Sequence, residues 1–224
     1  MSVQVKICGN RTPEDVELAA SAGADFAGVI LNVPGSPRSV TLEQAARVRA
    51  ACRIPLVAVF LDPPAEDIRA ACDVLAPFAV QLHGGESASV VRELKRTLGC
   101  QVWKVVHPRP GPQRPEDARL LNQRIAAHAD AGADVILLDT AVSPDLRGGT
   151  GVASDWEGAG RLIERATVPV FLAGGLRPDN VAAAIAAAQP AGVDVASGVE
   201  TSPGVKSPDA VREFVRAAKS AIPD

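Results

Sequence analysis

Eight short runs of apolar, mostly β-branched residues recur along the chain, and each is followed by a longer amphipathic segment. The runs lie at 3–8, 25–31, 55–61, 78–82, 101–106, 134–138, 169–173 and 193–197. Strands that are buried on both faces need such near-continuous apolar character. Eight strand–helix units suit a chain of 224 residues, because an eight-stranded α/β barrel typically takes about 200–250. We therefore predict one (β/α)8 TIM-barrel domain spanning residues 1–224.

Helix-start signals support this alternation of strands and helices. Thr12 precedes a proline and two acidic residues, the segment 41–44 reads as a capping box, and Ser207 precedes Pro208. The related segments AGAD (22–25), AGAD (131–134) and AGVD (191–194) each join a helix to a strand, and we expect their glycines to end the helices in the left-handed conformation. A doubly wound open sheet is the alternative fold, but a GxGxxG turn after the first strand is absent.

Composition excludes several partners. The net charge is −3 and aromatic residues make up 3% of the chain, which argues against nucleic-acid binding. With no apolar run of about 20 residues, no membrane span is expected. The four cysteines are scattered and the N-terminus lacks a signal-like apolar stretch, so we expect a cytoplasmic protein without disulfides. Aliphatic side chains are expected to fill the barrel interior.

Two glycine-containing loops near the end of the chain predict a phosphate site. They follow the seventh and eighth expected strands, in AGGL (173–176) and ASGVE (196–200). In barrels of this class the loops after the last two strands often bind phosphate, because backbone N–H groups there approach an anion closely. A third glycine-rich loop, GGTG (148–151), lies nearby in the expected topology. The predicted phosphate-binding residues are Gly149, Gly151, Gly174, Gly175, Ser197 and Gly198.

Cys8 and Asp139 stand at the ends of the first and sixth expected strands, where barrel enzymes place their chemistry. A thiolate can accept a proton and a carboxylic acid can donate one, which suits isomerisation of a sugar. Each residue also has a simpler interpretation, as a buried apolar thiol and as a capping carboxylate.

Other polar side chains follow the expected strands and complete the set of candidate ligands. We expect Arg38, His83 and Asp194 to contact the substrate, Arg38 by binding a carboxylate. A divalent metal held among Asp62, His83, His107 and Asp139 is an alternative, although no compact ligand motif supports it. The prediction is a site without metal or cofactor.

The strand ends also resemble those of a known family. The segments VKICGNRTPEDV (5–16), SPRSV (36–40), VQLHGGES (80–87), LLDT (137–140), GGTG with DW (148–156), LAGGLRPDNV (172–181) and GVDVASGVE (192–200) occur in order. Together they look like phosphoribosylanthranilate isomerase, the barrel enzyme of tryptophan biosynthesis, over nearly the whole chain.

This resemblance implies an Amadori rearrangement of N-(5′-phosphoribosyl)anthranilate to 1-(o-carboxyphenylamino)-1-deoxyribulose 5-phosphate. It makes Cys8 the general base, Asp139 the general acid and Arg38 the ligand of the anthranilate carboxylate. The expected partner is a small phosphorylated substrate, and the chain is expected to be a monomer or homodimer. A paralogue acting on another sugar phosphate, or a barrel that binds a phosphorylated metabolite without catalysis, remains the alternative.

Overall fold

The computed structural model describes residues 3–108, 114–139 and 155–221, and eight parallel strands in these ranges form a closed barrel. The strands are β1 (Gln4–Ile7), β2 (Phe26–Leu31), β4 (Leu56–Phe60), β5 (Ala79–Leu82), β6 (Gln101–Val106), β7 (Val135–Asp139), β8 (Val170–Ala173) and β9 (Gly192–Val195). Closure occurs at β1, which pairs with β9 on one side and with β2 on the other. The predicted TIM barrel is thereby confirmed.

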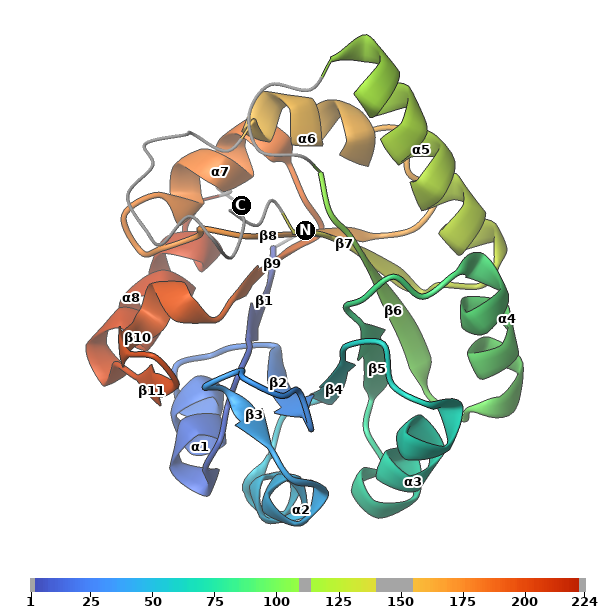
Figure 1. The fold of residues 1–224 in the computed structure, drawn as a ribbon. Coiled ribbons are helices and arrows are strands. Elements are labelled where there is room, and N and C mark those ends of the chain that lie inside the picture. Colours follow the sequence, from blue (N-terminus) through green and yellow to red (C-terminus); the bar gives the residue numbers. More distant parts are fainter. Residues whose placement is uncertain (1–2, 109–113, 140–154, 222–224) are drawn as a thin grey trace.

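Eight helices of the described residues surround the strands as an outer ring (Figure 1). They are α1 (Pro13–Ser21), α2 (Leu42–Ala51), α3 (Ala65–Leu75), α4 (Ala88–Thr97), α5 (Pro115–Asp130), α6 (Trp156–Ile163), α7 (Val181–Ala188) and α8 (Pro208–Lys219). The capping boxes at Thr12 and Thr41 form as predicted, each threonine accepting a hydrogen bond from the backbone of the third helical residue. No helix in the described ranges has the length and apolar character needed to cross a membrane.

The three glycines expected to end helices behave differently. Gly23 and Gly132 adopt positive φ values of 88° and 100°, as predicted. The expectation for Gly192 is wrong, because Gln189 takes the left-handed position after α7 and Gly192 opens β9. A Cβ on Gly192 would stand 2.5 Å from the ring of Phe171. Glycine is therefore required there by close packing of the barrel interior.

Aromatic side chains contribute more to the barrel interior than the composition suggested. Phe26, Trp103 and Phe171 lie inside the barrel, with the Trp103 ring 5.1 Å from Phe26 and 5.2 Å from Phe171. Branched residues such as Val57 and Leu137 pack around them. The expectation of an aliphatic interior is therefore only partly right.

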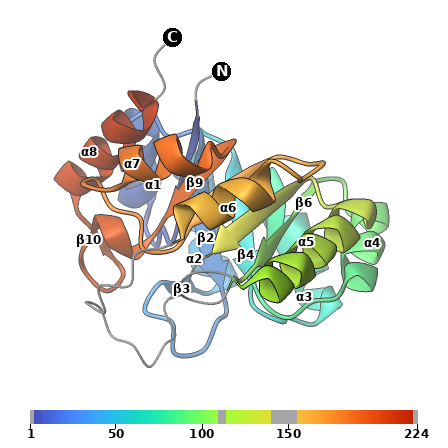
Figure 2. The ribbon, with the colours of Figure 1, turned by 90° about the horizontal axis from the view of Figure 1, so that it is seen from above.

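Alternation along each strand decides which side chains reach the barrel interior. Val5 and Ile7 of β1 face the helices, so Cys8 joins the inner cluster. Leu137 of β7 also faces inward, and Asp139, two residues further along the same strand, lies on the same face. Figure 2 shows the connection from β2 to β3 (Ser39–Val40) on the side of the barrel where the strands end. The polar strand-end residues therefore gather at one mouth.

Candidate active site

A pocket of about 570 Å³ opens at the C-terminal mouth of the barrel. This volume is typical of a small-molecule site. Its lining includes most of the predicted site residues that the structure describes: Cys8, His83, Asp139, Gly174, Gly175, Asp194, Ser197 and Gly198. The predicted ligands Gly149 and Gly151 lie outside the described residues.

Cys8 lies in the pocket beside a buried ion pair between Lys6 and Asp194, which the sequence analysis did not predict. Lys6 Nζ donates to Asp194 Oδ1 over 3.0 Å, and both side chains are almost completely buried. Burial raises the pKa of the Cys8 thiol, while the Lys6 ammonium opposes this rise by favouring the thiolate. A Cβ on Gly28 would stand 2.8 Å from Cys8 Sγ and 2.9 Å from Lys6 Nζ, so glycine leaves the space in which the two groups meet.

The charge on Lys6 is stable despite its burial. Desolvation acts to lower the pKa of Lys6, but Asp194 and Cys8 outweigh it and leave that pKa above its ordinary value. The ammonium therefore remains a fixed positive charge beneath Cys8. Asp194, predicted as a substrate ligand, contributes to the pocket wall and holds this ammonium. The sequence signal for Lys6 was a charged residue inside an otherwise apolar strand.

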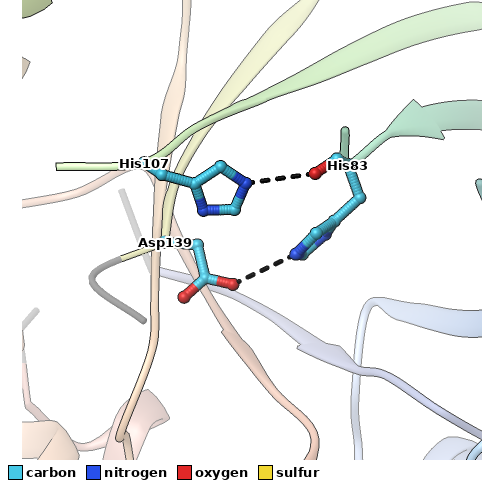
Figure 3. Close-up of side chains that lie close together, drawn as sticks. All are labelled: His83, His107 and Asp139. Atoms are coloured by element: carbon cyan, nitrogen blue, oxygen red, sulfur yellow. Dashed lines mark hydrogen bonds and ion pairs between the residues drawn. The ribbon is translucent and has the colours of Figure 1, made fainter. Parts of the chain in front are cut away.

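Asp139 faces two histidines from neighbouring strands (Figure 3). His83 follows β5, and its Nε2 lies 3.4 Å from Asp139 Oδ2. His107 follows β6, and its Nε2 lies 3.1 Å from the carbonyl oxygen of His83. The Gln81 side chain contacts the other nitrogen of the His83 ring, with its amide nitrogen 3.3 Å from His83 Nδ1. The carboxylate of Asp139 thus meets His83 of the loop after β5, and the loop after β6 contacts that histidine through His107.

The loop that carries His83 is anchored by a second buried ion pair, between Lys104 and Glu86. Lys104 Nζ donates to Glu86 Oε2 over 3.0 Å and to the Gly84 carbonyl over 2.8 Å. Glu86 Oε1 accepts hydrogen bonds from the backbone nitrogens of Asp62 and Gly84. Asp62 itself is bound to Gly85 N through Oδ1 and lies outside the group of His83, His107 and Asp139.

Glycines shape the corner of the pocket predicted to hold phosphate. Gly174 and Gly175 adopt positive φ values of 88° and 67°, a conformation that L side chains rarely take. Gly198 packs so closely on the Leu176 carbonyl oxygen that any Cβ would collide with it. Ser197 and Gly198 belong to a short 3₁₀ turn, η1 (Ser197–Val199), that follows β9. Gly174, Gly175, Ser197 and Gly198 all line the pocket, so this corner joins the loops after β8 and β9 at one part of its wall.

We expect Gly198→Ala to impair substrate binding more than turnover. The new methyl group would collide with the Leu176 carbonyl oxygen, so the loops after β8 and β9 must move apart. The expected result is a KM increased at least about tenfold, equivalent to about 1.4 kcal/mol of lost binding. Steady-state kinetics measure it. Gly99→Ala is the matched control, because a Cβ at Gly99 would meet no other atom within 4 Å; equal KM values for the two variants would contradict this role.

Arg38 lies outside the pocket lining and is already paired. Its Nε and Nη2 donate to the two carboxylate oxygens of Glu200 over 2.8 and 2.7 Å. Lys206 Nζ also reaches Glu200, at 3.0 Å. The sequence analysis assigned Arg38 to a substrate carboxylate and gave Glu200, the last residue of the segment 196–200, no role. Contact of Arg38 with a substrate carboxylate remains a prediction.

Comparison with known proteins decides the family. The model of the N-(5′-phosphoribosyl)anthranilate (PRA) isomerase family matches residues 5–217. The chain belongs to this family. It is 40% identical to the N-(5′-phosphoribosyl)anthranilate isomerase of Methanopyrus kandleri, and the similarity covers 97% of this chain and 99% of the relative.

Solved structures of PRA isomerases share the fold. The enzyme from Thermotoga maritima superposes with a TM-score of 0.83 at 32% identity, covering 97% of this chain and 98% of the other. A PRA isomerase solved in complex with reduced 1-(o-carboxyphenylamino)-1-deoxyribulose 5-phosphate gives a TM-score of 0.80 at 30% identity, with 97% and 98% coverage. The resemblance noted from the strand-end motifs is thereby confirmed for the family.

Proposed function

We propose that this chain catalyses the Amadori rearrangement of N-(5′-phosphoribosyl)anthranilate to 1-(o-carboxyphenylamino)-1-deoxyribulose 5-phosphate in tryptophan biosynthesis. One observation carries the proposal: a thiol and a carboxyl group, Cys8 and Asp139, line one pocket together with the glycine loops of Gly174 and Gly198. Membership of the PRA isomerase family and a relative solved with a reduced form of this product support the substrate.

The proposed first step is opening of the ribose ring. Protonated Asp139 donates its proton to the ring oxygen, the bond from C1′ to that oxygen breaks, and the nitrogen lone pair forms an iminium at C1′. Asp139 is suited to this step because it lies at the pocket wall with its carboxylate oriented by His83. General acid catalysis of this kind contributes typically about 10²–10⁴-fold to a rate.

In the second step Cys8 acts as the base. The iminium acidifies the C2′ proton, the Cys8 thiolate removes it, and the electron pair forms an enolamine that tautomerises to the C2′ ketone. Burial raises the pKa of Cys8, and the Lys6 ammonium opposes that rise and so favours the thiolate form. Residues of this chain therefore supply both proton transfers, and the reaction as written requires no metal or redox cofactor.

Binding of the substrate divides between two parts of the pocket. We propose that Gly174, Gly175, Ser197 and Gly198 hold the phosphate through backbone N–H groups, with Gly149 and Gly151 contributing from the loop after β7. Arg38 is the proposed ligand of the anthranilate carboxylate. For this contact, the substrate carboxylate must either replace Glu200 as the partner of Arg38 or bind the guanidinium nitrogen Nη1, which does not donate to Glu200. His83 and Asp194 complete the proposed contacts.

We further propose that residues 1–224 act as one barrel domain in the cytoplasm, as a monomer or homodimer. Closure of the barrel between β1 and β9 supports the single domain, since the two ends of the chain share one sheet. The four cysteines are free thiols, which suits a reducing compartment. Among the solved relatives are monomers derived from a dimeric isomerase of Thermotoga maritima, which supports either state.

Complementation tests the proposed function directly. A tryptophan auxotroph that lacks this isomerase is expected to grow without tryptophan when it expresses the chain, because the chain would restore the missing step. The purified protein is expected to convert the substrate in the presence of EDTA. Failure of the folded chain in both measurements would overturn the assignment. Turnover that EDTA abolishes would instead favour a metal-dependent reaction on the same fold.

A further inference from the structure

The three side chains His83, His107 and Asp139 offer ligand atoms that all lie within 4.8 Å of one another. They come from three consecutive barrel strands, after β5, after β6 and at the end of β7, and they converge on one point (Figure 3). We propose that these residues form a binding site for a divalent transition-metal ion of the Zn²⁺ type, and that the bound ion inhibits the isomerase by occupying its general acid.

The ligand set and spacing fit such an ion. Two histidines and one carboxylate, with a fourth position open, are a familiar ligand set for Zn²⁺. Bonds of about 2.0–2.1 Å in a tetrahedral site place neighbouring ligand atoms about 3.4 Å apart. His83 Nε2 and Asp139 Oδ2 are already 3.4 Å apart. The three side chains are only partly buried. Small changes in their torsion angles can therefore bring the other ligand atoms from within 4.8 Å of one another to this separation.

The hydrogen bonds around His107 prepare it as a ligand. Its Nε2 faces the His83 carbonyl oxygen at 3.1 Å, and because a carbonyl only accepts, Nε2 must carry the proton. In the neutral ring, Nδ1 then keeps its lone pair, and Figure 3 shows this nitrogen on the side of the ring that faces Asp139. A metal-bound histidine usually donates its other N–H to a carbonyl or carboxylate in this way.

Gln81 can play the same part for His83. Its side chain is fully buried, its amide nitrogen lies 3.3 Å from His83 Nδ1, and its oxygen Oε1 has no hydrogen-bond partner among the described residues. Rotation of the amide by half a turn would present Oε1 to an Nδ1–H group, and the lone pair of His83 Nε2 would then face Asp139. With the Gln81 amide in that orientation, each ring would donate its second N–H to an acceptor that fixes it for coordination.

Inhibition follows from the position of Asp139, and this part rests on the proposed function. A metal ion bound at Oδ2 requires the carboxylate form, so Asp139 could not donate a proton to the ribose ring oxygen. The ion would also occupy space at the pocket wall that Asp139 and His83 line. Metal binding and ring opening are therefore mutually exclusive.

Titration calorimetry of the full chain with Zn²⁺ tests the binding. Protein stripped with EDTA is expected to bind one ion per chain, and His107→Ala is expected to bind at least about tenfold more weakly, since even altered partners of metal ligands cost about 10–100-fold. His107→Gln keeps an N–H donor for the His83 carbonyl and serves as the second variant. Thermal melts of each variant verify folding. Unchanged affinity in folded His107 variants would overturn the site.

Two controls separate the possible sources of zinc binding and inhibition. The partly buried thiols Cys72 and Cys100 line a different pocket, so the double variant Cys72→Ser, Cys100→Ser is expected to bind zinc with unchanged affinity. Loss of zinc binding in that variant would refute the proposal.

In the isomerase assay, zinc is expected to inhibit wild type and to inhibit His107→Ala at least about tenfold less. Equal inhibition of both would contradict the mechanism. Calorimetry needs no turnover, so failure of the proposed function remains distinguishable from failure of the site.

Discussion

Replacement of Cys8 by alanine is expected to lower kcat by about 10²–10⁴-fold, the usual contribution of a general base. The variant retains the small apolar volume of the site but has no group that can remove the C2′ proton. The effect should fall on kcat more than on KM, because the phosphate corner at Gly174 and Gly198 is untouched. Steady-state disappearance of N-(5′-phosphoribosyl)anthranilate measures both constants.

Cys52→Ala is the matched control for Cys8. Cys52 is also buried and free, but its thiol contacts the Ile54 carbonyl oxygen at 3.2 Å and does not line the pocket. We expect this variant to retain wild-type kcat. A Cys8→Ala enzyme as active as Cys52→Ala would show that another group acts as the base.

The pH dependence of the wild type gives a separate check on Cys8. Burial raises the pKa of this thiol above its ordinary value, although Lys6 opposes the shift. The thiol form therefore predominates at neutral pH, and the thiolate fraction grows as the pH rises. The Cys8-dependent limb of kcat/KM is expected to rise with pH, and Cys8→Ala should lack it.

Strand periodicity made the barrel predictable from sequence. Each of the eight expected runs overlaps an observed strand, and the caps at Thr12, Thr41 and Ser207 mark the helix starts. These signals are local, since they depend on neighbours within one turn or a few strand residues. The sequence analysis missed the short elements β3, η1, β10 (Glu200–Ser202) and β11 (Val205–Lys206). Each has only two or three residues, too few to produce a periodic pattern.

The position of Cys8 and Asp139 at the barrel mouth could also be predicted from the sequence, because every parallel strand of a barrel ends at the same mouth. The ion pairs around the site could not be predicted in this way. Lys6 meets Asp194 across 188 residues of sequence, and Arg38 meets Glu200 across 162. The second pair joins the residue before β3 to the first residue of β10. The first pair depends on the register of β1 against β9, in which Lys6 lies opposite Asp194. No local pattern encodes that register.

Conversion of Asp139 to asparagine should be as damaging as loss of Cys8. The amide is nearly isosteric and can still meet His83 Nε2, which lies 3.4 Å from Oδ2 in the wild type, but it has no acidic proton for the ring oxygen. We expect kcat to fall by about 10²–10⁴-fold. Product affinity, measured by calorimetry, should change little, because the phosphate corner is formed by other loops.

Asp62→Asn is the matched control for this change. Asp62 lies just after β4, at the same mouth of the barrel as Asp139. Its carboxylate accepts a hydrogen bond from Gly85 N at 2.7 Å and does not line the pocket. An amide oxygen accepts the same bond, so kcat should remain close to that of wild type, and the free energy of unfolding should change by less than about 0.5 kcal/mol. If Asp139→Asn were to turn over substrate at the rate of Asp62→Asn, ring opening would have to proceed without Asp139, and the neighbouring His83, 3.4 Å away, would be the next proton donor to test.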